Sequence, residues 1–477
     1  MTEGRGRGGG AGLRPGLRAL RPKLPAAAAA GRAPALLLTV LLAGPGSMGA
    51  QTDGGALTLS QAVEATLRQH PSLGAARAGV AAAEAGIAEA RATRLPWLSA
   101  EAAFTRFELP MVVAPLHGFD PRQPPAFERG LAQGSLSLTY TLFDGGGRGA
   151  RIGRARAQTE GAEARASAAT ESLLAAVTSA YLLVASAREV LEAHDRQLAA
   201  LSSEGDRAQQ LLREGRAANV VVLRAQAALS RARAERVQAA AELEVAEREL
   251  ARLMGADAAF VQQLALAPVA LAPASPLPAR PELVARAGRG NRELARATSR
   301  VAAAEATAAE ARSAWFPRLQ LGGRYVEYGS SAGSFTGEWQ GGVQLGYPLF
   351  MAGARRHASD RADAEARASR EELRVTGLGV ERAVEEALAA LESARARVAA
   401  LAAAVEQSAE VARIEKLALD AGAGVQTDYL RAEAELFTAR AALTAARHGE
   451  IAARVELARL TGELSPEWLA RNLESGP

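Results

Sequence analysis

The chain has 477 residues, of which 48% are hydrophobic and only 4% aromatic, because alanine supplies much of the apolar content. Alanine is the best helix former, and arginine and glutamate follow closely, so this composition predicts long helices. The formal net charge of +4, from 56 basic and 52 acidic residues, gives no reason to expect nucleic acid as a partner, and the absence of cysteine excludes disulfides and thiolate metal sites.

The first 50 residues have the layout of a secretory signal peptide. Basic side chains precede an apolar run at 33–43, and small residues follow that run up to Ala50. The apolar run is about half as long as a membrane-spanning helix requires, which makes a membrane anchor the less favoured alternative. We therefore expect residues 1–50 to be a signal peptide, and we expect no other segment to reach the length of a membrane-spanning helix.

The rest of the chain carries an internal duplication. Residues 80–91 (VAAAEAGIAEAR) recur at 301–312 (VAAAEATAAEAR) with an offset of 221. Leu142-Phe143 recurs as Leu349-Phe350 with an offset of 207, which then holds to the end of the unit. The constant register of these landmarks does not arise from alanine-rich composition alone. The predicted domains are a first repeat at 51–267, a Pro-rich linker at 268–281, a second repeat at 282–462 and a C-terminal tail at 463–477.

Each repeat should contain a pair of β-strands after its first helical segment. Apolar residues alternate with polar or small ones at about 97–109 and 131–143, and again at about 318–328 and 338–350. Strands of this length with one apolar face and aromatic residues near their ends are typical of transmembrane barrels. A half-buried hairpin packed on helices would also alternate. Because the polar faces carry Gln, Ser, Thr, Arg and Glu, as the wall of a wet lumen would, we favour the barrel.

A long helical hairpin follows each strand pair, at 145–254 and at 352–461, with the folds at Gly215 and Gly422. The first helix, which should end near Arg213, would be roughly 100 Å long, too long for a globular domain. Apolar positions along these segments step by four and three residues, which is the spacing of a coiled coil. In the first hairpin they include Leu173, Val177, Ala180 and Val184.

Four strands from one chain do not close a barrel. Unpaired sheet edges cannot face lipid, and known outer-membrane barrels have at least eight strands, so two or three copies must share one barrel. Several motifs then appear in a specific order: LTLSQAVEATLRQHPSL (57–73), AEA…LP (83–96), YTLFDGG (140–146), REGRAANVVVLRAQAAL (213–229) and DAGAGVQTDYLRAEAEL (420–436). With these motifs and the heptads, essentially all of 57–462 resembles the TolC-like outer-membrane efflux protein family.

The resemblance implies a mainly α fold with a membrane β-barrel. A long antiparallel α-helical coiled-coil barrel would cross the periplasm, and four strands per chain would join one 12-stranded barrel of a homotrimer in the cell outer membrane. The implied partners are outer-membrane lipid, a periplasmic adaptor (membrane fusion) protein, and an inner-membrane efflux pump or ABC exporter that supplies the energy. The subunit itself would be a passive export conduit. A periplasmic structural or adaptor coiled-coil protein without a pore is the alternative.

The resemblance also places a closed periplasmic end, where the adaptor docks, at the two hairpin tips. The residues expected there are Gly215, Asn219, Leu223, Gly422, Asp428, Leu430 and Arg431. Asp428 occupies a position where the family often has an acidic residue lining the aperture. Its equivalent in the first repeat is Val221, and Arg431 stands where a second acidic residue is common. Three Asp428 carboxylates in a ring would favour cations, or Asp428 could instead cap the helix that starts there.

We identify no residues that would support an enzyme. Gly145 to Gly147 follow a barrel-type strand and are better explained as a hinge than as a phosphate-binding loop. The five histidines are scattered without metal-ligand spacing, and no Ser/His/Asp arrangement stands out. The sequence therefore predicts no catalytic site, metal or cofactor, and it leaves the exported substrate open.

Overall fold

The computed structural model describes residues 56–112, 121–122, 124, 127–272, 277–330, 333 and 335–475. The expected signal peptide at 1–50 lies outside these residues. The chain separates into two units, Met1–Gly54 and Gly55–Pro477. The description that follows concerns the second unit.

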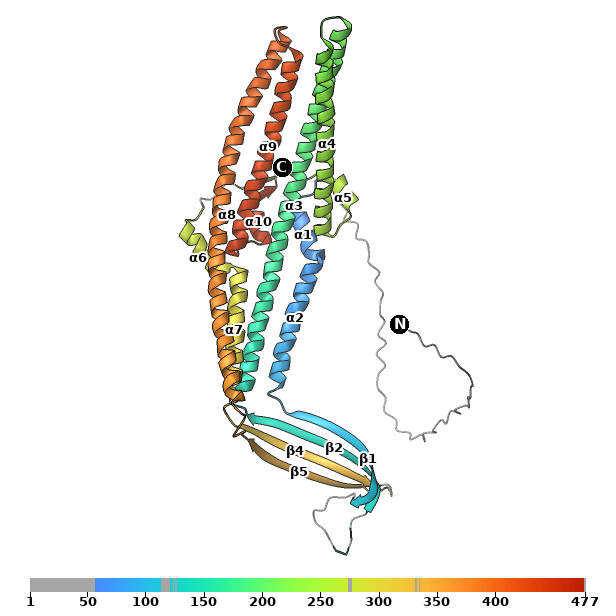
Figure 1. Cartoon of the computed structure of the whole chain (residues 1–477), viewed down its shortest axis with the longest axis vertical. Coiled ribbons are helices and arrows are strands. Elements are labelled where there is room, and N and C mark those ends of the chain that lie inside the picture. The colour runs from blue at the N-terminus through green and yellow to red at the C-terminus, as the bar shows by residue number, and fades with distance from the viewer. Residues whose placement is uncertain are drawn as a thin grey trace, which may run out of the picture. The chain divides into compact units, whose positions relative to one another are not determined.

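The second unit repeats one order of elements (Figure 1). Its first half contains α1 (Leu59–Gln69), α2 (Pro71–Ala92), β1 (Trp97–Val112), β2 (Phe127–Phe143), α3 (Gly147–Arg213), α4 (Asn219–Met254), α5 (Ala258–Gln263) and β3 (Val269–Leu271). Its second half contains α6 (Arg280–Gly290), α7 (Arg292–Ser313), β4 (Arg318–Ser330), β5 (Phe335–Gly346), α8 (Ala354–Asp420), α9 (Gln426–Thr461), α10 (Pro466–Asn472) and β6 (Leu473–Ser475). The bounds of α1 and α2 recur in α6 and α7 after 221 residues, and those of α3 and α4 recur in α8 and α9 after 207.

Local sequence signals define the ends of these helices. Thr58 and Gln61 form a reciprocal capping box at the start of α1, and Pro71 is the first residue of α2, where its missing N–H is not needed. Gly255 and Gly462 end α4 and α9 in the left-handed conformation, with φ of 66° and 72°. A residue with a Cβ is disfavoured there, so these glycines stop each long helix at an equivalent point.

The main hydrophobic core lies where α1, α3, α4, α9 and α10 meet, part-way along the long helices. The heptad positions expected from the sequence, Leu173, Val177, Ala180 and Val184, are all buried, which confirms that prediction. Further toward the hairpin turns, the buried positions are mostly alanines, such as Ala208, Ala225, Ala232 and Ala239. Small side chains let the helix axes approach closely, and the long helices therefore pack as coiled coils with a thin core.

One expectation about membrane helices needs correction. Among the described residues, α3 is long and apolar enough to cross a membrane by length and composition, although the sequence suggested that no such segment remained. Half of its most apolar window is buried inside the structure. The apolar stretch contributes Leu174, Val177 and Tyr181 to the main core. We therefore interpret it as a core helix.

Tyr181 joins the segment before α1 to the segment after α5. Its buried hydroxyl oxygen lies 2.6 Å from the carbonyl oxygen of Leu57 and 2.7 Å from that of Ala267. Burial raises the pKa of Tyr181 to about 12. The amide of Leu57 also donates to Ala265 O, at 2.8 Å. These bonds hold the segment before α1 against α3.

His448 of α9 is held against α3 by similar contacts. Its Nδ1 lies 2.5 Å from Ser186 Oγ, and its ring also hydrogen-bonds the backbone of Leu182. Burial lowers the pKa of His448, and this effect outweighs the Leu182 bond and the nearby Glu189 carboxylate, which both raise it. The side chain is therefore a neutral part of the contact between the two helical hairpins at neutral pH.

The four long strands form one antiparallel sheet in the order β1-β2-β4-β5. Among the described residues, the outer edges of β1 and β5 pair with no other strand. The register places the apolar residues of all four strands on one face, because Leu138 lies opposite both Leu98 and Gly323, and Tyr325 lies opposite both Leu136 and Trp339. Leu98 is 67% exposed and Trp339 79% exposed. The sheet thus presents an apolar surface that extends across all four strands, and charged residues (Arg106, Glu327) interrupt it only toward the ends far from the helices.

Polar side chains gather on the opposite face of the sheet. Gln320 Nε2 donates to Thr141 Oγ1 at 3.4 Å, and Arg324 Nη2 donates to Ser135 Oγ at 3.3 Å. The two faces are therefore distinct across the whole sheet, as the sequence alternation predicted.

Several strand ends differ from the expected ones by two to four residues: β2 begins at Phe127 and β5 at Phe335, both earlier than expected, and β4 extends to Ser330. β1 runs on to Val112 because the ladder is irregular between Arg106 and Met111, and that irregularity accommodates Pro110, which has no N–H to donate. β5 ends at Gly346, although the sequence suggested a strand reaching 350. Pro348 follows and cannot continue the ladder. The mainly α fold with a four-stranded sheet is confirmed.

Candidate functional site at the helical hairpin tips

The first tip is the tight turn between α3 and α4. Gly215 adopts the left-handed conformation with φ of 69°. The amide of Gly215 donates to Leu212 O at 3.0 Å, and the amide of Arg216 donates to Leu211 O at 2.8 Å. This is a Schellman arrangement, which satisfies the last carbonyls of α3 and requires a residue that tolerates positive φ.

The second tip, between α8 and α9, has the same backbone geometry. Gly422 has φ of 73°, and the amide of Ala423 donates to Ala418 O at 2.9 Å. Gly424 adds a constraint that the sequence reasoning missed. A Cβ at that position would lie 2.8 Å from Leu419 N and 2.9 Å from Ala418 C. The backbone of the second turn therefore passes too close to α8 for any side chain at 424.

The first tip exposes apolar side chains. Asn219 is the first residue of α4 and is exposed. Leu223 is 56% exposed, and Val220 and Val221 beside it are 49% and 44% exposed. Only Val222 turns inward, where it packs with small residues of α3 and α4. The tip therefore presents a short apolar ridge to its surroundings.

The second tip places equivalent residues differently. Leu430 is partly buried, although its counterpart Leu223 is exposed. Leu430 and Arg431 line a groove of about 430 Å³ between α9 and α3, opposite Leu201 and Glu204. The difference arises because α9 packs on α3, whereas α4 contacts α3 from the other side. The predicted tip residues therefore fall into two groups. Those of the first tip face outward, and those of the second tip border the contact between the two hairpins.

Asp428 does not cap α9. The N-cap is Val425, which accepts no side-chain hydrogen bond, and Asp428 is the third helical residue. Its carboxylate is half exposed and lies 3.9 Å from Arg431 Nη1. An exposed pair at this distance contributes little to stability, but a carboxylate in the first turn is favourable next to the helix dipole. The strict capping explanation is therefore wrong.

Tyr429 is a further tip residue that sequence reasoning missed. Burial raises its pKa, and the neighbouring carboxylates of Glu433 and Asp420 raise it further, with Glu433 also hydrogen-bonded to the phenol. The phenol of Tyr429 therefore stays protonated and neutral beside these two carboxylates. An aromatic residue directly after Asp428 was the only available signal.

The two tips carry opposite charge. Residues 213–226 contain three arginines and one glutamate, whereas the equivalent residues 420–433 contain three acidic residues and one arginine. Ion pairs between the exposed groups are local, as between Arg216 and Glu214 at 3.3 Å. Among the described residues no group of three or more His, Cys, Asp or Glu side chains could hold a metal ion. The two tips therefore share a backbone turn but differ in net charge.

The family model described as outer membrane efflux protein matches residues 62–256 and again residues 283–463. The chain belongs to the outer membrane efflux protein family. Protein CyaE of Bordetella pertussis is 30% identical over 326 residues, which are 64% of this chain and 65% of that protein. The match therefore spans slightly less than two thirds of this relative.

Solved structures share the fold of this outer membrane efflux protein. A membrane protein from Pseudomonas aeruginosa superposes with a TM-score of 0.69 at 25% identity, over 85% of this chain and 93% of that one. The CmeC outer membrane channel of Campylobacter jejuni superposes with a TM-score of 0.71 over 87% and 88%, but at 15% identity it supports the fold alone. The family resemblance inferred from the sequence is confirmed, and it is a family of outer membrane channels rather than enzymes.

Proposed function

We propose that this outer membrane efflux protein is one subunit of a homotrimeric channel that carries substrates across the periplasm and the outer membrane. Residues 1–50 direct export, and the two repeats at 51–267 and 282–462 each supply two strands and one long hairpin. The channel is a passive conduit that works with a periplasmic adaptor and an inner-membrane pump or ABC exporter. It needs no cofactor, because the conduit performs no chemistry.

The observation that carries this proposal is the sheet. Its apolar face extends across all four strands in their helix-proximal part, yet the described residues leave both of its edges unpaired. In lipid such edges would leave many backbone groups without hydrogen bonds, at several kcal/mol each. Copies of the chain remove this cost by pairing β1 of one with β5 of the next. Three copies close the barrel with their apolar faces toward lipid and the Gln320–Arg324 face toward the lumen.

The tips form the periplasmic end in this arrangement. β2 leads through three residues into α3, whose 67 residues extend roughly 100 Å to the turn at Gly215. The exposed ridge at Leu223 and the acidic second tip form the surface on which an adaptor docks. Because Arg431 stands close to Asp428, the aperture should favour cations only weakly.

Disulfide trapping tests the shared barrel. Because the chain has no native cysteines, every cross-link must come from the introduced ones. Ser99 and Gln344 lie on the polar face near the helix-proximal ends of β1 and β5. The double variant Ser99→Cys/Gln344→Cys should give a ladder of linked species in outer-membrane fractions that stops at the trimer. The matched control, Ser99→Cys/Thr336→Cys, places the second cysteine on the same face at the far end of β5 and should not cross-link.

Heating before electrophoresis separates the proposal from its alternative. A trimer with a shared barrel should migrate anomalously until it is heated. A periplasmic coiled-coil adaptor without a pore would appear in the soluble fraction as an unlinked species. That result, or a ladder that stops at the dimer, would refute the trimeric channel.

A further inference from the structure

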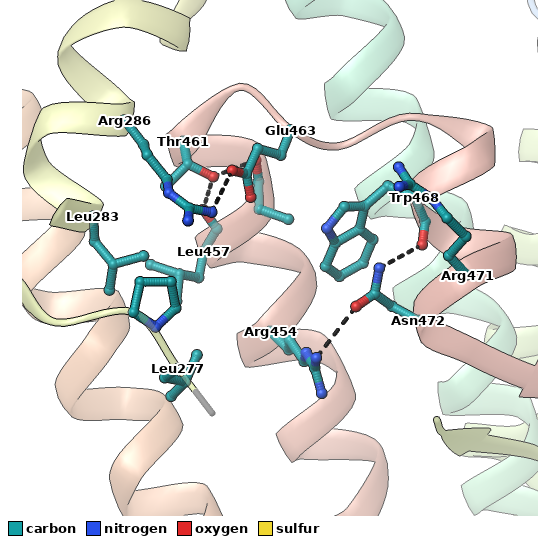
Figure 2. Close-up of a pocket in the computed structure, with 12 residues that line it drawn as sticks. Leu277, Leu283, Arg286, Arg454, Leu457, Thr461, Glu463, Trp468, Arg471 and Asn472 are labelled. Atoms are coloured by element: carbon teal, nitrogen blue, oxygen red, sulfur yellow. Dashed lines mark hydrogen bonds and ion pairs between the residues drawn. The ribbon is translucent and has the colours of Figure 1, made fainter. Parts of the chain in front are cut away.

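A pocket in the second half of the chain lies beside the main core, at the end of α9 that is opposite the tip. Its volume is about 630 Å³, and α6, α9, α10 and the segment before α6 surround it. Figure 2 shows Arg286 and Leu283 on one side, Trp468 and Asn472 on the other, and Arg454 between them. The pocket therefore combines an apolar wall with guanidinium groups.

The equivalent region of the first half is a filled core. Trp468 corresponds to Val261 and Leu457 to Leu250 at the offset of 207, and both first-half residues are fully buried. Three positions that are uncharged or acidic in the first half have become arginines. These are Arg286 in place of Ala65, Arg454 in place of Glu247, and Arg471 in place of Leu264. Leu457 and Trp468 are nearly as buried, at 4% and 9% exposed, so the halves differ mainly in the three arginines around the second-half pocket.

The change at Arg454 removes a buried ion pair. In the first half, Arg188 Nη2 lies 2.8 Å from Glu247 Oε1, and Glu247 is only 7% exposed. The second-half equivalents are Arg395 and Arg454, so two cations occupy the positions of a cation and an anion. Arg395 instead pairs with Glu450 at 3.2 Å. Glu450, one turn before Arg454, thus neutralises Arg395, while Arg454 itself forms no ion pair among the described residues.

Arg454 lacks part of its hydrogen bonding. Nη2 donates to Asn472 Oδ1 at 3.2 Å, and Asn472 Nδ2 donates to Trp468 O at 2.9 Å. Nη1 is buried and has no hydrogen-bond partner among the described residues. Burial lowers the pKa of Arg454, and Arg395 lowers it further, with Glu450 opposing both. A guanidinium held in this way is costly to the fold unless an anion reaches it.

The other two arginines are already engaged. Arg286 forms ion pairs with Glu282 and with Glu463, the latter at 2.9 Å. Arg471 donates from Nε to the backbone oxygen of Glu467 at 3.2 Å. Two carboxylates therefore neutralise Arg286, whereas Arg454 keeps a guanidinium nitrogen without a hydrogen-bond partner among the described residues. Trp468 and Leu283 offer apolar surface on either side of it.

We propose that this pocket binds a small organic anion, whose oxyanion group accepts hydrogen bonds from Arg454 and whose apolar body lies against Trp468 and Leu283. A guanidinium presents two parallel donors that match a carboxylate or a phosphate. The pocket volume suits a ligand with one ring or a short aliphatic chain. The ligand takes the place of the missing Glu247-type carboxylate.

Intrinsic fluorescence of the purified full-length protein provides the assay, with benzoate, benzyl alcohol and inorganic phosphate as probes. Trp468 is the pocket tryptophan, and Trp468→Phe identifies its share of the signal. Benzoate should bind saturably with a Kd of about 1 mM or tighter, benzyl alcohol should not bind, and phosphate should bind more weakly than benzoate. Phosphate binding as tight as benzoate would mean that the apolar body contributes nothing, and would overturn that half of the proposal.

Arg454→Glu is the decisive variant, because it recreates the carboxylate that faces arginine in the first half and so should fold. Benzoate affinity should fall at least tenfold. Arg397→Glu makes the same charge change at an exposed position of α8 and should leave affinity unchanged. Equal binding by Arg454→Glu, equal binding of benzyl alcohol, or no saturation by about 10 mM benzoate would each overturn the proposal. None of these outcomes depends on the oligomeric state.

Discussion

Removing the carboxylate of Glu247 is the sharpest test of how the first half is held together. Arg188 reaches across from α3 and donates to Glu247 Oε1 at 2.8 Å from Nη2. Glu247 is 7% exposed and Arg188 26% exposed. Breaking a buried pair by neutralising one partner costs about 3–5 kcal/mol, because the remaining charge stays buried.

The Glu247→Gln change should reduce the free energy of local unfolding by the lower end of that range. Arg188 keeps two bonds to backbone carbonyls, to Leu264 O at 2.6 Å and to Val261 O at 3.0 Å. A loss of about 3 kcal/mol corresponds to an increase of about 100-fold in the local opening equilibrium. Hydrogen exchange of α4 amides at 244–254, followed by mass spectrometry on the full-length protein, measures this directly.

The control is Glu249→Gln, two residues along the same helix. Glu249 pairs with Arg252 within one helical turn, and both side chains are largely exposed. Solvent screens such a pair, so exchange should change little. If both variants accelerated exchange equally, or if Glu247→Gln left it unchanged, the buried pair would not stabilise the first half and the reasoning would fail.

Three further predictions concern the tip, the hairpin contact and the sheet. Gly215→Ala should destabilise the α3–α4 turn by about 1–2 kcal/mol through its positive φ, whereas Gly205→Ala within α3 should be neutral or stabilising; exchange at the tip amides compares them. Since the folded pKa of His448 lies below its ordinary value of 6.5, its contribution to stability is present above that pH and is lost as the pH falls below it. His448→Gln should therefore reduce the rise in the α3 opening equilibrium between about pH 7.5 and about pH 5.5, obtained from exchange rates corrected for the pH dependence of intrinsic amide exchange; an undiminished rise would contradict this. Leu138→Arg, on the apolar face, should cost about 2–4 kcal/mol in the membrane and deplete heat-modifiable trimer from outer membranes, while Thr139→Arg, on the polar face, should not.

The fold was largely readable from the sequence because its signals are periodic. Heptad steps gave the buried positions of α3, and alternation gave both faces of the sheet. The strand ends were less readable, since only the ladder reveals that Pro110 is tolerated at an irregularity while Pro348 ends β5. Whether equivalent residues face outward depends on which helices are neighbours. The exposed Leu223 and the half-buried Leu430 therefore could not be told apart in advance.

The tip residues show the same limit. The glycines at both turns were identifiable from their place at the end of a heptad run, because only a residue that tolerates positive φ can reverse the helix there. The need for Gly424 arises because the turn passes close to the backbone of α8, which no sequence pattern encodes. The role of Asp428 was open because cap and first-turn positions differ by a few residues, and the structure places the cap at Val425.

The two halves have diverged in charge while keeping their backbone. The turns at Gly215 and Gly422 have φ within a few degrees of each other, yet residues 213–226 are net basic and 420–433 net acidic. In the proposed trimer, six hairpins would therefore alternate in charge around the periplasmic end. Six copies of a chain with a single repeat would instead bring together six hairpins of the same charge. Like charges at a narrow aperture repel and hold it open, whereas alternating charges attract and favour closure. In the proposed trimer, the charge difference between the two repeats would therefore favour closure of the periplasmic end.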